Sequence, residues 1–287
     1  MSYREEVEQY KKTHPYKTAN IKGAEFSYLY CGEGEQVIVF LVGGLGLSVL
    51  GKPYVLELEK KYKILTFDYP YECNTNQKLC DGIAGLMEYL GIASAIFVGS
   101  SYGGYLSQIF ARKYPEKTAG LCLFSTAGLN EDTIRGLSAK EKMADRYFKI
   151  LRVVPYALLK PVMRRACMKH VVNASEEEYR YLKELFKEVF RNYTAKLDYH
   201  MTSLLVDIVK QKPCTAEDFA YLDDKVLLIL PDEDDSFTPK MQQDLVDMMK
   251  NPVVVEHMDG GHLATLLRVE KYIETIDKFI KERICYE

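Results

Sequence analysis

Short apolar runs along the chain have the pattern of strands that are buried on both faces of a sheet. The clearest runs occupy residues 36–42, 62–68, 94–100, 120–125 and 225–230. Residues 25–31 have the pattern of an edge strand. In the first half of the chain, segments with helical spacing alternate with these runs, as the apolar positions Ile83, Leu86, Met87 and Leu90 illustrate. This alternation predicts an α/β fold, with a mostly parallel sheet wrapped by helices.

The alternation stops after residue 127 and returns only at residue 225. Ser175 and Glu178 have the spacing of a capping box, in which each side chain satisfies a backbone N–H of the first helical turn. An apolar stripe follows at steps of three or four residues, formed by Tyr179, Leu182, Phe186, Val189, Tyr193 and Leu197. The sequence therefore predicts an α/β core of residues 1–127 and 225–287, interrupted by a helical insertion at 128–224.

The last part of the chain returns to the pattern of the core. A helix is expected from Pro239 onward, followed by a strand near 252–258. The final helix carries one apolar stripe, formed by Leu266, Val269, Ile273, Ile276 and Ile280. We find no internal repeat and no flexible linker, so the two parts of the core are expected to fold as one unit.

The composition narrows the class of protein. Hydrophobic residues make up 47% and charged residues 28% of the chain, which is typical of a globular protein and excludes a disordered one. Lysine and arginine number 38 against 41 acidic residues, a net charge of −3 that argues against a nucleic-acid partner. Residues 131–170 are locally basic. This excess predicts either a face for an anionic substrate or membrane surface, or a solvated face attracted to acidic helices nearby.

The seven cysteines and the N-terminal residues bear on the compartment. No C-x-x-C pair occurs, which favours free thiols in a reducing environment. Residues 1–12 are charged and lack the apolar core of a signal peptide. The longest uncharged stretch, 91–111, contains serines and glycines that fit a strand, turn and helix better than a membrane span. We therefore expect a cytoplasmic protein without a transmembrane segment.

A candidate nucleophile follows the third buried strand. Residues 99–103 read G-x-S-x-G, centred on Ser101, and a helical pattern follows. A nucleophile on a sharp strand-to-helix turn needs very small neighbours two residues away on either side, because these pass close to its backbone. Gly99 and Gly103 meet that need for Ser101. Ser100 has Val98 and Tyr102 at the corresponding positions, which excludes it as the nucleophile.

A serine nucleophile needs a base, and His262 is the best placed of five histidines. It follows the last strand pattern in the turn Gly260-Gly261-His262 and precedes the last helix. An imidazole there can point back over the carboxyl edge of the sheet, where Ser101 is expected. The other four histidines lack such a placement: His14, His170, His200 and His257.

The acid that orients the base should follow the strand at 225–230. An acidic segment begins there, and Asp234 is the first choice for the acid, with Asp235 as the alternative. A calcium loop starting at Asp232 would need glycine at its sixth position and glutamate at its twelfth, but Phe237 and Gln243 stand there. We therefore predict neither a metal nor a cofactor.

These features together resemble the α/β-hydrolase superfamily. The order Ser101, Asp234, His262 matches the order of the superfamily's catalytic triad, and the insertion lies where these enzymes carry a lid. The resemblance implies an oxyanion hole made of two backbone N–H groups. One belongs to Tyr102, and the other to the loop 43–46, with Leu45 as the first choice and Gly44 as the alternative.

A narrower resemblance is to maspardin-like proteins, and it rests on residues 68–72, 80–82, 103–108 and 155–160.

The superfamily implies a serine hydrolase that cleaves a small carboxylic ester, or an amide or thioester, through an acyl-enzyme on Ser101. The maspardin-like resemblance implies an alternative, a non-catalytic protein-interaction module. An aminopeptidase is a further alternative, and it would need carboxylates of the insertion, such as Glu176 to Glu178, near Ser101. The sequence does not indicate an oligomeric state.

Overall fold

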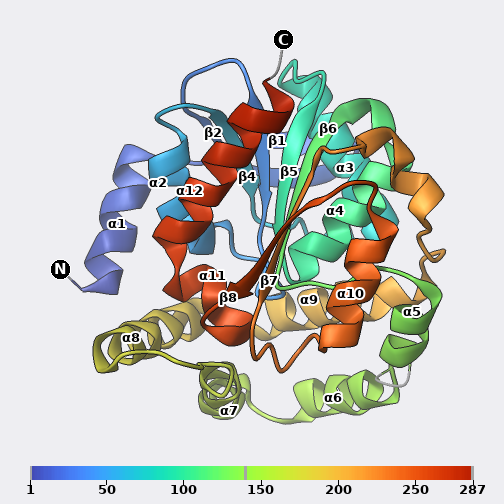
Figure 1. Cartoon of the computed structure of the whole chain (residues 1–287). Helices are drawn as coiled ribbons and strands as arrows, with labels where there is room; N and C mark the ends of the chain where they lie inside the picture. Colours follow the sequence, from blue (N-terminus) through green and yellow to red (C-terminus); the bar gives the residue numbers. More distant parts are fainter. Residues whose placement is uncertain (1, 139–140, 286–287) are drawn as a thin grey trace.

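The computed structural model describes residues 2–138 and 141–285. Eight strands form one sheet: β1 (Lys17–Ile21), β2 (Ala24–Cys31), β3 (Val37–Leu41), β4 (Lys63–Phe67), β5 (Ala95–Ser100), β6 (Thr118–Phe124), β7 (Val226–Pro231) and β8 (Val253–Met258). Their order is β1-β2-β4-β3-β5-β6-β7-β8 (Figure 1). β2 is antiparallel to both of its neighbours, and all other pairs are parallel. The prediction of a mostly parallel sheet is confirmed.

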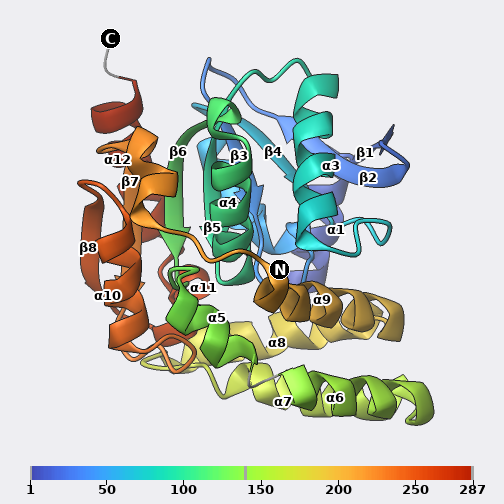
Figure 2. The same cartoon turned by 90° about the vertical axis from the view of Figure 1, so that its right-hand side faces the viewer.

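Helices cover both faces of the sheet, and the inner parallel strands β3 to β7 are buried on both sides. α2 (Lys52–Leu58) and α12 (Val269–Phe279) pack together on one face, with α1 (Tyr3–Thr13) beside them. α3 (Asn76–Tyr89) and α4 (Tyr102–Lys113) cover the other face (Figure 2). The remaining helices of the core are α10 (Pro239–Met248) and the short α11 (Ala264–Leu267).

Within the described residues, five α-helices lie between β6 and β7. They are α5 (Glu131–Ser138), α6 (Glu141–Val153), α7 (Tyr156–Met168), α8 (Glu176–Asn192) and α9 (Ala195–Asp207). In both views they lie together beyond one end of the sheet (Figure 2). α8 begins with the predicted capping box of Ser175 and Glu178. Leu182, Phe186 and Val189 of its predicted stripe join a second buried cluster that includes Tyr3 of α1, whereas Tyr179 is exposed. That these helices form a separate lid domain stays a prediction.

Two expectations about single elements are wrong. Residues 25–31 are not an edge strand, because β1 pairs with β2 on its outer side. β1 reads KTANI and is mostly exposed, so it lacks the apolar run that the other strands show. The last helix is not continuous, because Arg268, with φ −116° and ψ 37°, separates α11 from α12. No apolar periodicity indicates that break.

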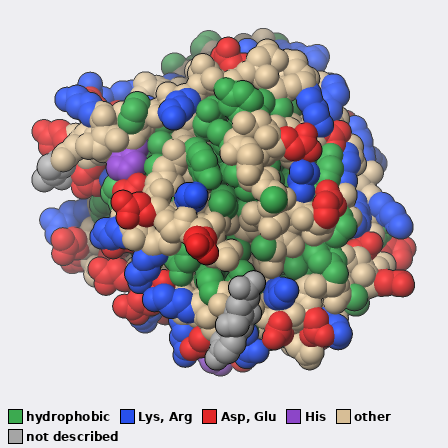
Figure 3. Space-filling model, turned by 90° about the horizontal axis from the view of Figure 1, so that it is seen from above, with side chains coloured by type: hydrophobic (Ala, Val, Ile, Leu, Met, Phe, Trp, Pro, Cys, Tyr) green, Lys and Arg blue, Asp and Glu red, His purple; other side chains and the backbone are tan. Residues whose placement is uncertain are grey.

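The end of the sheet opposite α5–α9 is seen in Figure 3. Basic and acidic side chains are interspersed there around hydrophobic patches, without a large area of one sign. This distribution agrees with the nearly balanced charge of the chain. Across the described residues, no helix is both long enough and apolar enough for a membrane span.

Candidate active site

Ser101 lies on a sharp turn between β5 and α4. Its backbone has φ 53° and ψ −119°, a conformation that residues other than glycine rarely adopt. Its N–H donates to Phe124 O of the neighbouring strand at 3.0 Å, and its carbonyl accepts from Thr126 Oγ1 at 3.0 Å. These contacts hold the turn in a strained conformation, which is common at functional sites.

The two glycines of the G-x-S-x-G segment lie where the chain passes close to itself. A Cβ on Gly99 would be 2.4 Å from Gly103 O, and a Cβ on Gly103 would be 2.1 Å from Leu41 O. Backbone atoms cannot move aside as a flexible side chain can, so neither position has room for a larger residue. The close approach lets the turn place Ser101 at the carboxyl end of β5.

His262 and Asp234 form a hydrogen-bonded pair at the same end of the sheet. His262 Nδ1 lies 3.1 Å from both carboxylate oxygens of Asp234. The Asp234 side chain is 0% exposed, and its Oδ1 also accepts from the N–H groups of Ser236 at 2.8 Å and Phe237 at 3.1 Å. A carboxylate can only accept, so His262 Nδ1 carries a proton in this pair. That leaves Nε2 as the atom that can take a proton from a nucleophile.

Asp235, the alternative acid, contacts a different histidine. Its Oδ1 lies 2.7 Å from Nδ1 of His170, which lies two residues after the end of α7. The His170 ring lies 5.7 Å from the His262 ring, measured between centroids. From the sequence, His170 was excluded as the base. No spacing in the chain predicts that it lies near the site, because it reaches the site only through the packing of the insertion against the core.

Ser101 and His262 line the same cavity, which has a volume of about 270 Å³. Its walls are mainly apolar, and they come from both the core and the insertion. The lining residues are Phe40, Val42, Gly43, Gly44, Leu45, Leu50, Gly51, Tyr54, Ser100, Ser101, Phe124, Cys167, His170, Phe186, His262, Leu263, Thr265 and Leu266. No hydrogen bond between Ser101 Oγ and His262 is present among the described residues; in ligand-free structures such contacts are often long.

The loop after β3 forms one wall of this cavity. Gly44 and Leu45 both line it, and a Cβ on Gly43 would lie 3.4 Å from Ser101 Cβ. The loop is closed by a hydrogen bond from Gly46 N to Gly43 O at 3.0 Å. Its far end is held by the carboxylate of Asp68, which accepts from the N–H and the hydroxyl of Ser48 at 2.8 and 2.6 Å. The loop is therefore fixed beside Ser101.

Tyr102, the first residue of α4, ties the turn to the insertion. Its side chain is buried, and burial raises the pKa of its phenol well above the usual value, so the hydroxyl remains a donor. It donates to Asn76 Oδ1 at 2.8 Å. Asn76 in turn donates its backbone N–H to Asp207 of α9 at 2.8 Å, and its side-chain amide to Leu204 O at 2.9 Å. A buried chain of hydrogen bonds thus joins α4, α3 and α9.

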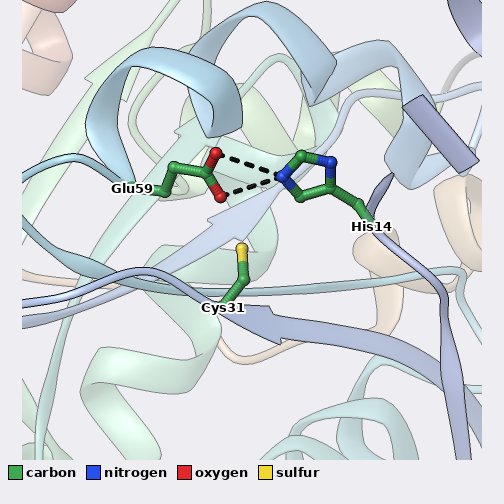
Figure 4. Close-up of side chains that lie close together, drawn as sticks. All are labelled: His14, Cys31 and Glu59. Carbon is green, nitrogen blue, oxygen red and sulfur yellow. Dashed lines mark hydrogen bonds and ion pairs between the residues drawn. The ribbon is translucent and has the colours of Figure 1, made fainter. Parts of the chain in front are cut away.

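One group of side chains has donor atoms that a metal ion could use. His14, Cys31 and Glu59 offer ligand atoms that lie within 4.8 Å of one another (Figure 4). His14 Nε2 already contacts the Glu59 carboxylate at 3.0 Å. Burial, followed by the contact with Glu59, raises the pKa of the Cys31 thiol to about 12, so the thiolate that a metal requires is disfavoured. The group is best described as a hydrogen-bonded histidine–carboxylate pair beside a neutral thiol.

Comparisons with known proteins address the family. The model of the alpha/beta hydrolase family matches residues 39–275. A proline iminopeptidase of Pestalotiopsis fici is 31% identical over 37% of this chain and 42% of its own length. A 2-hydroxy-6-oxononadienedioate/2-hydroxy-6-oxononatrienedioate hydrolase of Comamonas testosteroni is 30% identical over 41% of this chain and 46% of its own length. The matches thus span less than half of these curated relatives.

Solved structures extend the likeness to most of the chain. The enol-lactonase of Burkholderia xenovorans aligns over 92% of this chain and 100% of its own, with a TM-score of 0.73 and 19% identity. An esterase of Thermogutta terrifontis aligns over 94% of this chain and 99% of its own, also with a TM-score of 0.73, at 17% identity. The narrower resemblance to maspardin-like proteins stays a prediction. The family match, which covers more than half of the chain, and the shared fold show that this protein belongs to the alpha/beta hydrolase family.

Proposed function

We propose that this protein is a serine hydrolase that cleaves small carboxylic esters through an acyl-enzyme on Ser101. The observation that carries the proposal is one cavity with three features. A serine on a strained strand-to-helix turn faces it, a histidine lines it, and a fully buried carboxylate binds that histidine. This arrangement supports acyl transfer, because it combines a nucleophile with an oriented base.

The reaction follows from the roles of these groups. Ser101 Oγ attacks the ester carbonyl while His262 Nε2 accepts its proton. Asp234 keeps the imidazole in the required tautomer and stabilises the imidazolium that forms. His262 then returns the proton to the leaving alcohol, and the acyl-enzyme is hydrolysed by water activated in the same way. No metal or cofactor takes part in these steps.

Backbone N–H groups are proposed to hold the negative charge that develops on the carbonyl oxygen. Tyr102 N–H lies at the start of α4, where the helix dipole also favours negative charge. The second donor is Leu45, with Gly44 as the alternative, because both line the cavity beside Ser101. The loss of one such donor typically costs about 3–4 kcal/mol of transition-state stabilisation.

The cavity indicates the size and polarity of the substrate. Its volume of about 270 Å³ lies just below the range of about 300–1,000 Å³ that is typical of ligand pockets, and its walls are mainly apolar. A short acyl group fits these properties. We further propose that the insertion, residues 128–224, acts as a lid, since Cys167, His170 and Phe186 supply one wall.

The aminopeptidase alternative has one relative in its favour, the proline iminopeptidase described above. An aminopeptidase would need a carboxylate to bind the substrate amine, yet the residues lining the cavity include no aspartate or glutamate. Glu178 is instead used by the capping box and by Arg268. We therefore prefer the ester, and leave the non-catalytic alternative to experiment.

The proposal is tested with a fluorophosphonate probe and p-nitrophenyl esters of graded acyl length. The probe should label Ser101, and short acyl chains should be preferred. Ser101→Ala should abolish labelling and lower kcat by up to about 10⁶-fold, because it removes the nucleophile. Ser203→Ala serves as the matched control, because Ser203 is half-buried on α9, does not line the cavity, and donates its hydroxyl to Tyr199 O of the same helix at 2.7 Å. A purified protein that neither labels nor turns over any ester would support the non-catalytic alternative.

A further inference from the structure

A segment of the insertion contacts the loop that carries Asp234. We name residues 169–178 the bridge segment and residues 232–238 the acid loop. His170 Nδ1 of the bridge segment lies 2.7 Å from Asp235 Oδ1, and Asn173 Nδ2 donates to Glu233 Oε2 at 3.1 Å. Glu233 and Asp235 are the two neighbours of Asp234 in sequence. The bridge segment therefore holds the acid loop on both sides of the buried carboxylate.

The same segment is tied to the loop that carries His262. We name residues 259–268 the histidine loop. Arg268 donates from Nη2 to Asn173 O at 2.9 Å, and from Nη1 to Glu178 Oε1 at 2.5 Å. Its Nε and Nη2 also donate to Asp259 Oδ2 at 3.2 and 2.7 Å. One guanidinium thus joins both ends of the histidine loop to the bridge segment.

Burial makes the Arg268 contacts more effective than an ordinary surface pair. The Arg268 side chain is only 14% exposed, while its partners Glu178 and Asp259 are 33% and 46% exposed, so its charge-assisted hydrogen bonds are partly shielded from solvent. Asp232 of the acid loop forms a second pair, with His257 of β8, that offers a contrast. His257 and Asp232 lie 3.2 Å apart, but their side chains are 81% and 54% exposed, and both belong to the core. Pairs as exposed as His257 and Asp232 contribute little to structure. The His170–Asp235 pair, with side chains 36% and 49% exposed, lies between these two cases.

We propose that the bridge segment positions the catalytic pair. Seated between the two loops, it sets the separation at which Asp234 accepts from His262 Nδ1. His170, Asn173 and Arg268 are positioning residues in this scheme, and none of them reacts. The inference rests on the proposed function, and it assigns to the insertion a share in the reaction rate as well as in the walls of the cavity. A displacement of about 1 Å in such a site can lower a rate by about 10²-fold.

A double-mutant cycle tests this inference. His170→Ala removes a contact with the acid loop, and Arg268→Met removes the contacts with the histidine loop. A bridge needs both attachments, so each single variant should lower kcat for p-nitrophenyl acetate by about 10–100-fold. KM should change little in Arg268→Met, because Arg268, unlike His170, does not line the cavity. The double variant should be scarcely worse than the poorer single variant, because the bridge is already broken. Two independent structural effects would instead multiply.

Three further variants separate positioning from general loss of structure. His257→Ala removes the exposed pair from the same acid loop, and it should leave kcat unchanged. His170→Gln keeps an N–H that can donate to Asp235, and it should recover most of the lost rate. Thermal unfolding shows whether each variant folds. If Arg268→Met does not fold, Arg268→Lys keeps the charge but lacks the planar fork, and it takes the same place in the cycle.

A spectroscopic readout does not depend on turnover. The Nδ1 proton of His262 should give a downfield proton resonance, assigned by its loss in His262→Gln. This resonance should shift or broaden in His170→Ala and Arg268→Met, and it should stay unchanged in His257→Ala. If the protein lacks esterase activity but these shifts occur, the proposed function is wrong, whereas the positioning role of the bridge segment is supported. Multiplicative losses in the cycle, or an unchanged resonance and kcat in both single variants, would overturn the bridge.

Discussion

Each end of the sheet holds a histidine paired with a carboxylate, and the two pairs are alike in geometry. At the carboxyl end, His262 lies 3.1 Å from Asp234, with side chains 15% and 0% exposed. At the amino end, His14 lies 3.0 Å from Glu59, with side chains 13% and 22% exposed. A histidine–carboxylate pair of this kind therefore does not by itself identify an active site.

The two ends differ in what lies beside the pair. Ser101 stands on a strained turn at a helix N-terminus and opens on an apolar cavity. Cys31, the corresponding neighbour of His14, is the last residue of the regular strand β2, and burial raises the pKa of its thiol to about 12 (Figure 4). Backbone geometry and access, more than the pair itself, separate a candidate nucleophile from a structural thiol.

The largest difference between the two histidine–carboxylate pairs should appear when one carboxylate charge is removed at each end of the sheet. Asp234→Asn should lower kcat by about 10⁴-fold while the fold persists, because an amide stabilises the wrong tautomer of His262. Glu59→Gln makes the same chemical change at the other end, and activity should remain. The measurement is kcat for p-nitrophenyl acetate. A harmless Asp234→Asn together with a crippling Asp235→Asn would move the acid by one residue.

A smaller effect is expected for the reactivity of Cys31. The thiolate is the reactive form, and the pKa of about 12 lies about three units above that of an ordinary thiol. Iodoacetamide at pH 8 should therefore alkylate Cys31 about 10³-fold more slowly than free cysteine, as followed by mass spectrometry of its peptide. Alkylation at the rate of free cysteine would mean that His14 activates the thiol, and the two ends would then be chemically alike.

The smallest effect concerns a carboxylate at the amino end that stabilises the fold. Burial disfavours the Asp277 carboxylate, but hydrogen bonds from Lys281, Lys61 and Tyr62 outweigh it and lower its pKa to about 2. Asp277→Asn should therefore lower the free energy of unfolding at pH 7 by at most about 1 kcal/mol.

The pH dependence supplies the check on that prediction. The pKa of Asp277 is lower in the folded chain than the unfolded value of about 3.9, so its contribution is present above pH 4 and is lost as the pH falls toward 2. Denaturant unfolding of both proteins across this range measures the difference. A gap between the variant and the parent that persists at pH 2 would contradict the assignment.

The sequence allowed the fold to be predicted where burial leaves a pattern. The inner strands are buried on both faces and therefore read as apolar runs, whereas β1 is polar and mostly exposed and was missed. The break at Arg268 was missed as well. Arg268 contacts Asn173 and Glu178 there, which are distant in sequence and leave no periodicity to read.

The candidate site shows the same division. Ser101 and His262 could be singled out because glycines and strand ends mark their turns. Asp234 could be preferred over Asp235 only as a first choice, since both follow β7 and differ only in where tertiary packing directs their side chains. Contacts from two other parts of the chain, His262 and His170, distinguish them. Short-range geometry leaves a trace in the sequence, whereas long-range contacts between polar side chains do not.

The outer strand β8 also bears on how copies of this protein behave at high concentration. A sheet edge offers unpaired backbone groups on which a second sheet could add. Here the strand is irregular: the register of its pairing with β7 shifts between Ile229 and Pro231, and His257 has a φ of 60°. Glu256 and His257 are also exposed. A bent strand whose second half is polar and exposed is a poor template for further strands, so this half of β8 should resist edge-to-edge aggregation.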